Sequence, residues 1–153
     1  MSGSTNKKIK NASPKEYNGI KFRSTLECSC YKKLEQSGLQ FEYESESAVL
    51  MEGFYLENIV LYAPTRVKGK LSKTLDKQEG KIRAITYTPD FIVNTDTHII
   101  YFDVKGKEND TYPLKKKMFL KQLEKLPTIK KIIFIEPHSV KQMVQAIDFI
   151  KKL

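Results

Sequence analysis

The sequence lacks tryptophan and contains only two cysteines and two histidines among its 153 residues. Cys28 and Cys30 are separated by a single residue, so they cannot build a disulfide framework or a four-ligand zinc site. With only two histidines, a histidine-rich metal site is also excluded. This cysteine usage is typical of a reducing compartment, and we therefore expect a cytoplasmic protein.

Long apolar runs are also missing. The run Ile132–Ile135 is among the longest purely apolar ones, and it is far too short to cross a bilayer. Residues 1–15 contain no apolar segment of the kind that a secretory signal peptide requires. We therefore expect neither a membrane-spanning segment nor a signal peptide.

Acidic residues are outnumbered, with 18 Asp and Glu against 27 Lys and Arg, which gives a formal net charge of +9 and a pI near 9.4. A chain this basic favours a polyanionic partner, nucleic acid first and an acidic membrane surface second. Hydrophobic residues make up 40% and charged residues 29%, as in ordinary globular proteins. The length suits one domain whose core needs no disulfide or structural metal.

Local patterns divide the chain into expected elements. Residues 1–19 are rich in Ser, Asn and Lys and predict a flexible basic N-terminal arm, followed by a folded domain over residues 20–153. The capping box of Ser24 to Glu27 predicts the start of a helix that ends at Gly38. Residues 41–46 alternate like a strand, and residues 54–63 form another extended segment.

A basic stretch follows at residues 65–83, where only two acids oppose seven bases and no apolar period is visible. We expect a basic loop or a loose hairpin there. The seven bases are Arg66, Lys68, Lys70, Lys73, Lys77, Lys81 and Arg83.

The second half predicts a hairpin, a helix, a strand and a helix. Residues 82–93 and 98–105 are rich in β-branched and aromatic residues and flank a turn at 94–97. A helix is expected over 113–126, a buried parallel strand over 131–136 and an amphipathic helix over 139–152. The fold class is thus α/β, a single domain with a mixed sheet flanked by helices.

The hairpin contains the words YTPDF and YFDVKG, which concentrate charge on one face. If residue 94 pairs with residue 97, Asp90 lies opposite Tyr101 and diagonal to Asp103. Because residues alternate faces along a strand, Asp90, Asp103 and Lys105 share one face, while the other face is apolar. Diagonal neighbours are about 7–8 Å apart, which lets two carboxylates reach one ion.

This arrangement suits phosphodiester hydrolysis. Mg²⁺ prefers oxygen ligands and commonly uses one or two carboxylates with phosphate oxygens, a role that Asp90 and Asp103 can fill. Lys105 is placed to orient or polarise the attacking water. Glu27, on the first expected helix, is a candidate to position water or to help hold a second ion.

The set formed by Glu27, Pro89-Asp90 and Asp103-Val104-Lys105 resembles the E…PD…(D/E)xK signature of the PD-(D/E)xK nuclease superfamily. The words FRSTLE, YTPDF and DVKG are most similar to phage endonuclease I-like proteins, which resemble Holliday-junction resolvases. The resemblance implies an αβββαβ core and a Mg²⁺-dependent DNA endonuclease in which Mn²⁺ substitutes. It also implies the backbone carbonyl of Val104 as a further metal ligand and a bacterial or phage-infected cell as the setting.

Simpler interpretations stand beside these roles. Glu27 is the last residue of a capping box, where a glutamate normally accepts a backbone N–H. Asp90 follows a proline and could shape a turn. Asp103 and Lys105 could be an exposed ion pair, which contributes little to stability.

The helix expected from Pro113 carries candidate DNA contacts. Lys115 and Gln122 fall within its apolar arc, where a lysine stem often simply snorkels, or else both touch the scissile phosphate. Lys117 and Lys121 lie outside the arc and are candidates for contacts with the DNA backbone. From the basic stretch we add Arg66, Lys68 and Lys70 as candidate DNA-binding residues.

The resemblance predicts cleavage of branched DNA, and symmetric cleavage of a four-way junction would require a homodimer. Two alternatives remain: a restriction- or transposase-type nuclease subunit that cuts duplex DNA, and a non-catalytic basic module that binds nucleic acid. DNA is the expected partner under all three readings, and no membrane partner is expected.

Overall fold

The computed structural model describes residues 14–153, which fall into two compact units. The first unit comprises residues 14–47 and 88–153, and the second comprises residues 48–87. The second unit is therefore an insertion within the sequence of the first.

The first unit has an α/β fold built on a four-stranded sheet in the order β14-β13-β12-β3. Strands β13 and β14 are parallel and the other pairs are antiparallel, so the sheet is mixed. Around this sheet the elements follow the order αβββαβ with α3 added at the end, and the predicted fold class is confirmed. The elements of the first unit are β1 (Lys15–Tyr17), β2 (Ile20–Phe22), α1 (Thr25–Ser37), β3 (Phe41–Tyr43), β12 (Phe91–Asn94), β13 (His98–Phe102), α2 (Tyr112–Leu123), β14 (Lys131–Ile135) and α3 (Val140–Ile150).

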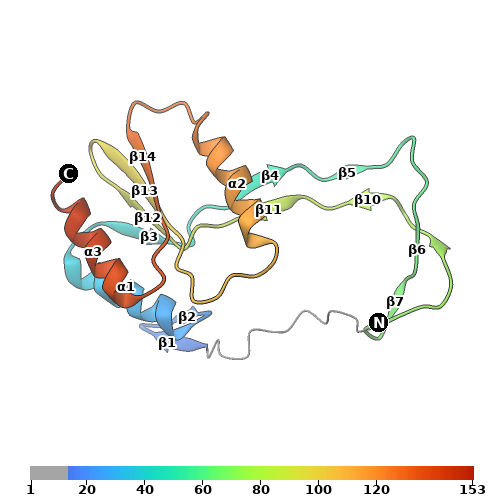
Figure 1. Ribbon diagram of the computed structural model, residues 1–153, viewed down its shortest axis with the longest axis horizontal. Coiled ribbons are helices and arrows are strands. Elements are labelled where there is room, and N and C mark those ends of the chain that lie inside the picture. The colour runs from blue at the N-terminus through green and yellow to red at the C-terminus, as the bar shows by residue number, and fades with distance from the viewer. Residues whose placement is uncertain (1–13) are drawn as a thin grey trace. The chain divides into compact units, whose positions relative to one another are not determined.

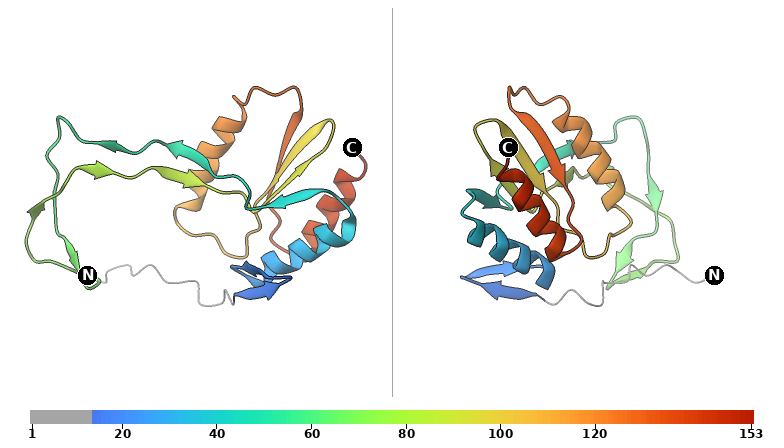
Figure 2. Two further views of the ribbon diagram at one scale, coloured as in Figure 1. Left: turned by 180° about the vertical axis from the view of Figure 1, so that it is seen from behind. Right: turned by 60° about the vertical axis from the view of Figure 1, so that its left-hand side comes forward.

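Helices cover both faces of this sheet, with α1 and α3 on one face and α2 on the other (Figures 1 and 2). On the α2 face, the ring of Phe119 packs edge-on against Tyr101 at 5.5 Å between centroids. The opposite face is the main core, because the strand residues pointing that way are fully apolar. That core is made by Cys30, Leu34, Phe91, Val93, Ile100, Phe102, Val104, Met143, Ala146, Ile147 and Ile150.

Helix α1 begins and ends where its capping signals predict. The Ser24 side chain accepts the backbone N–H of Glu27 at 3.1 Å, and Gly38 terminates the helix with φ 75°. A positive φ favours glycine, which explains the stop at that residue. The Glu27 side chain accepts the N–H of Arg23 at 3.0 Å, so the carboxylate faces back toward the chain that enters the helix.

The register of the β12–β13 hairpin differs from the prediction. Phe91 pairs with Phe102 and Asn94 with Ile99, so four residues, and not the expected two, lie between the last paired positions of the hairpin. The N–H of Thr95 reaches the carbonyl of His98 and closes this loop. Asp90 consequently lies in line with Asp103 and not opposite Tyr101. A shift of two residues preserves the faces, so the predicted apolar face is still the core face.

Other expected elements also need correction. Residues 1–13 of the predicted N-terminal arm lie outside the described residues, whereas residues 15–17 form β1 and pair with β2. The turn is Asn18-Gly19, with φ 50° and 77°, a combination that favours tight hairpins. Strand β14 is an edge strand and only half-buried, and α2 ends at Leu123 and not at residue 126.

The second unit contains only short antiparallel strand pairs: β4 with β11, β5 with β10, β6 with β9, and β7 with β8. Of the basic loop or loose hairpin expected over 65–83, only β7 and β8 pair with each other, and β9 and β10 pair with strands before residue 65 to make a longer ribbon. Within residues 14–153, no helix is long and apolar enough to cross a membrane. The strands are β4 (Ala48–Met51), β5 (Phe54–Tyr55), β6 (Tyr62–Ala63), β7 (Arg66–Val67), β8 (Lys70–Leu71), β9 (Asp76–Lys77), β10 (Lys81–Ile82) and β11 (Ile85–Tyr87).

Candidate active site

Three carboxylates are buried in the first unit. Glu27 and Asp90 are each 4% exposed and Asp103 is 1% exposed, and among residues 14–153 no other charged side chain is buried. Burying a charge is costly unless it is paired or coordinates a metal. Three buried acids in one unit are therefore candidates for a functional site.

The sheet explains how these acids meet. Each of its four strands has an acidic residue immediately beyond one end, and the register brings all four ends to the same edge. The ladder continues past the strands, since Glu44 donates its N–H to the carbonyl of Asp90 at 2.9 Å and Asp103 donates to Ile135 at 3.1 Å. Neighbouring strands are about 4.8 Å apart, so the acids form a row. In sheet order this acidic row is Glu44, Asp90, Asp103 and Glu136.

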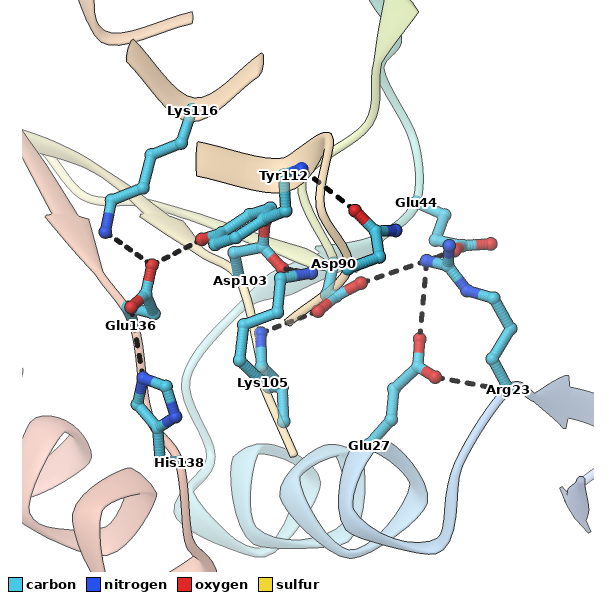
Figure 3. A network of polar contacts seen from close by, with 12 residues as sticks. Arg23, Glu27, Glu44, Asp90, Asp103, Lys105, Tyr112, Lys116, Glu136 and His138 are labelled. Atoms are coloured by element: carbon cyan, nitrogen blue, oxygen red, sulfur yellow. Dashed lines mark hydrogen bonds and ion pairs between the residues drawn. The ribbon is translucent and has the colours of Figure 1, made fainter. Parts of the chain in front are cut away.

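Arg23 holds one end of the acidic row together with Glu27 from α1 (Figure 3). Its guanidinium forms ion pairs with Glu44 and with Asp90, the latter at 3.0 Å, and lies 3.7 Å from Glu27. Tyr43 donates its hydroxyl to Glu27 at 2.9 Å. Oxygens of Glu27, Glu44 and Asp90 all lie within 4.8 Å of one another, which is close enough to share one cation.

Lys105 and Tyr112 occupy the middle of the row. The Lys105 ammonium is paired with Asp103 and lies 4.2 Å from the centroid of the Tyr112 ring. The Tyr112 hydroxyl donates to Glu136, which also accepts from Lys116 at 2.6 Å. A single tyrosine therefore contacts Lys105 with its ring face and the neighbouring acid with its hydroxyl (Figure 3).

Burial and like charge act together on Asp90. Desolvation first, and then the nearby charges of Asp103 and Glu27, raise the pKa of Asp90 to about 7, despite the opposing effect of Lys105 and of the Val104 N–H bond at 2.6 Å. The contrast with Glu136 is informative. Although burial opposes it, hydrogen bonds from Lys116, Tyr112 and His138 lower the pKa of Glu136 to about 2. The two ends of this comparison differ in their partners, because Glu136 accepts three hydrogen bonds while Asp90 is buried beside two other acids.

The donor set suits a hard divalent cation. In the group Glu27, Glu44 and Asp90 all ligand atoms are carboxylate oxygens, which Mg²⁺ prefers, whereas a second group, Glu108, Glu136 and His138, includes an imidazole. The raised pKa of Asp90 has burial as its first cause and the nearby charges of Asp103 and Glu27 as its second, and a bound cation would favour the ionised form of this carboxylate. The residues present therefore fit a magnesium ion.

Comparison with known proteins gives one relationship. The profile of the family described as "Protein of unknown function (DUF1064)" matches residues 7–136. The chain belongs to the DUF1064 family. Searches of curated proteins and of solved structures found no match. The DUF1064 match extends from before β1 to Glu136, so it includes the whole acidic row.

In this DUF1064 chain, the four residues predicted to carry the chemistry come together. Glu27, Asp90, Asp103 and Lys105 lie in one network, although Asp90 is in line with Asp103 and not diagonal to it. Val104 donates its N–H to Asp90, and its carbonyl stays a predicted ligand.

The residues predicted to bind DNA are spread more widely. On α2, Lys115 is half-buried, whereas Lys117, Lys121 and Gln122 are exposed. The helix residue whose ammonium joins the network is Lys116, which was not among the predicted DNA contacts. The remaining candidates, Arg66, Lys68 and Lys70, are exposed and belong to the second unit.

Sequence reasoning missed part of this site in the DUF1064 chain. Residues 41–46 were expected to form a strand, but no role was given to Glu44, Glu136, Tyr112 or Arg23. A signal for the two acids was present, because each directly follows the end of a strand, as Asp103 does. Seeing it required the sheet order, since only the order brings these ends together.

Proposed function

We propose that this protein is a magnesium-dependent DNA endonuclease that hydrolyses phosphodiester bonds. The observation that supports it best is the burial of three acids, Glu27, Asp90 and Asp103, beside the lysine of a DxK sequence. In this proposal the chain is a member of the PD-(D/E)xK nuclease superfamily within its DUF1064 family. Because a phosphate is itself negative, such a site needs a cation before substrate can enter.

Each residue has a defined task. Asp90 and Asp103 hold the ion, and Glu27 completes the cluster from α1. The bound Mg²⁺, or Mn²⁺ in its place, would stabilise negative charge that develops on the phosphate oxygens. Lys105 reaches the same point through its pairing with Asp103, where its ammonium orients the water and interacts with the phosphate.

The reaction is an in-line displacement at phosphorus. The water oxygen forms a bond to phosphorus as the bond to the 3′ oxygen breaks, and the water loses one proton while the 3′ oxygen gains one. The products are a 5′-phosphate and a 3′-hydroxyl. The chain's own contribution is the positioning of carboxylates on rigid strand ends, which keeps the reacting groups oriented.

We propose that the substrate is branched DNA and that the enzyme acts within a bacterial or phage-infected cell. This rests on the similarity of FRSTLE, YTPDF and DVKG to endonuclease I-like proteins, and a homodimer would follow for symmetric cuts.

The test is cleavage of a labelled four-way junction and a matched linear duplex, with Mg²⁺ or with EDTA. Lys105→Ala and Asp103→Asn should each reduce the cleavage rate by about 10³-fold, the loss typical of a removed transition-state contact. Glu42→Gln is the matched control, since Glu42 is an exposed acid on β3. This variant should cleave DNA at the rate of the parent. Equal cutting of both substrates would reject the branched substrate, and bound but uncut DNA would reject the enzyme in favour of a binding module.

A further inference from the structure

Residues 54–83 of the second unit, which we call the ribbon from here on, carry exposed positive charge that the proposed chemistry does not use. All seven of its bases are exposed, and only three acids share the segment. Among residues 14–153, none of these seven bases forms an ion pair with a carboxylate of the chain. One of the three acids, Asp76, is occupied by the hydroxyls of Thr65, Ser72 and Thr74. The positive charge is therefore available to a partner.

The register of the ribbon places a base beside an apolar side chain in four of its six cross-strand pairs. Cross-strand partners project from the same face, so each pair presents one cation and one apolar group together. In the first of them, the ammonium of Lys81 lies 6.0 Å from the centroid of the Tyr55 ring. The four pairs are Lys81 with Tyr55, Lys77 with Tyr62, Arg66 with Leu71, and Lys70 with Val67.

The ribbon holds itself together without a core. Most of its large apolar residues are exposed, with Leu56 and Ile82 half-buried, and backbone bonds such as Leu56 to Gly80 and Gln78 to Leu61, both at 2.9 Å, join the strands. The tip is a two-residue turn at Lys68-Gly69, with φ 49° and 80°. Glycine or asparagine is favoured at such positions, so a lysine at the first of them costs stability and adds charge at the tip.

We propose that the ribbon is a DNA-binding arm that lies in a groove of duplex DNA and supplies affinity separately from catalysis. This inference names the partner of the proposed nuclease and so rests on that function. A two-stranded β-ribbon has the width that the major groove admits. Lysines on its faces suit phosphate oxygens, while the paired aromatic and aliphatic groups suit sugars and base edges.

Charge decides between DNA and a second copy of the chain as the partner. Two ribbons placed against each other would bring unpaired bases together, and like charges in contact are unfavourable. When lysines bind DNA, they displace the counterions condensed on its phosphates, and the release of these ions favours binding. The exposed apolar groups alone would suit either partner, whereas the seven free bases suit only a polyanion.

The test compares two triple variants that remove the same charge. The arm variant is Lys68→Asn, Lys70→Gln and Lys73→Gln, and asparagine at 68 suits the positive φ, so the turn is retained. The control variant carries Gln at Lys141, Lys151 and Lys152, three exposed lysines at α3 in the other unit. Thermal unfolding followed by circular dichroism establishes that both fold like the parent.

Binding is measured by fluorescence anisotropy on a duplex of about two helical turns, in EDTA, over a range of KCl concentrations. We expect the arm variant to lose about 100-fold in affinity near physiological salt, and its salt slope to fall by roughly 0.9 for each lost phosphate contact. The control variant should lose far less. Equal binding by the two variants would overturn the arm, and so would a parental dimer that only the arm variant loses.

Because no metal is present in that assay, it separates the two proposals. If the parent binds through the arm but cuts no DNA with Mg²⁺, the nuclease fails and the arm stands. If the parent cuts DNA and the arm variant binds as tightly as the parent, the nuclease stands and the arm fails.

Discussion

The two units of this chain handle charge in opposite ways. In the first unit, acids gather at the end of a sheet, three of them buried, and the row is held by Arg23, Lys105 and Lys116. In the ribbon, bases are exposed and have no acidic partner within the described part of the chain. Burying an acid costs free energy of desolvation, whereas a base that stays in water loses no hydration and keeps its side-chain freedom. The first arrangement suits chemistry on one bond, and the second suits affinity for a long polyanion.

The same contrast holds for apolar residues. Phe102 and Ile100 are completely buried between sheet and helices, whereas Leu75 in the ribbon is 70% exposed. Hydrophobic burial therefore stabilises the first unit, and local backbone bonds stabilise the second. The following predictions test how far this division extends.

The largest expected effect is on stability. Phe102→Ala removes a ring from the centre of the core and should lower the free energy of unfolding by about 3–5 kcal/mol. Leu75→Ala removes a side chain that already lies in water and should change it by less than about 0.5 kcal/mol. Urea unfolding followed by circular dichroism measures both. Comparable losses in the two variants would mean that the ribbon side chain is buried in solution, against the division drawn above.

The next effect is a pH dependence in metal-free protein. Burial raises the pKa of Asp90 in the folded protein to about 7, above the ordinary aspartate value of 3.8, so folding favours the protonated form. Stability is therefore fully present below the unfolded pKa and is lost as pH rises from about 4 through 7, by on the order of a few kcal/mol. Chemical unfolding in EDTA at a series of pH values measures this loss.

Two variants locate the source of that pH dependence. Asp90→Asn should flatten the profile, because the titrating group is gone, while Lys68→Asn should leave its shape unchanged. Added Mg²⁺ should reverse the loss at neutral pH, since it favours the ionised carboxylate. A profile that keeps its slope in Asp90→Asn would assign the titration to another group and contradict our account of the acidic row.

Features of the fold that depend on residues close together in the sequence could be predicted, whereas features that depend on distant residues could not. The limits of α1 depend on Ser24 and Gly38, which act on their neighbours, and both were predicted correctly. The core face of the hairpin depends on alternation, and it survived an error in register of two residues. Asn18-Gly19 was a local signal that went unused, so β1 was taken for part of a flexible arm.

The composition of the site depends on longer distances. Glu27, Asp90, Asp103 and Lys105 were found through a motif, but Glu44 and Glu136 join them only because β3 and β14 flank the hairpin. Arg23 and Lys116 were missed because nothing local distinguishes them from other surface bases. Their roles appear when the strands they approach are placed in order.

The smallest effect concerns how Lys105 is held. Its ammonium lies over the Tyr112 ring, and an interaction of this kind contributes about 0.5–2 kcal/mol. Tyr112→Leu removes the ring and should reduce kcat of DNA cleavage by about 10-fold with little change in KM, because it loosens a group that acts during the reaction. The arm variant should do the reverse, raising KM and leaving kcat unchanged at saturating DNA.

Tyr112→Phe separates the two contacts of this tyrosine. It keeps the ring beneath Lys105 but removes the hydroxyl that donates to Glu136. If the ring positions Lys105, Tyr112→Phe should restore most of the kcat that Tyr112→Leu loses, with KM close to that of the parent in both variants. Equal losses in the two variants would assign the effect to the hydroxyl, so that Tyr112 would act by holding Glu136 and Lys116 in place. Either result distinguishes a residue that tunes the rate from the ribbon lysines, whose effect is on affinity alone.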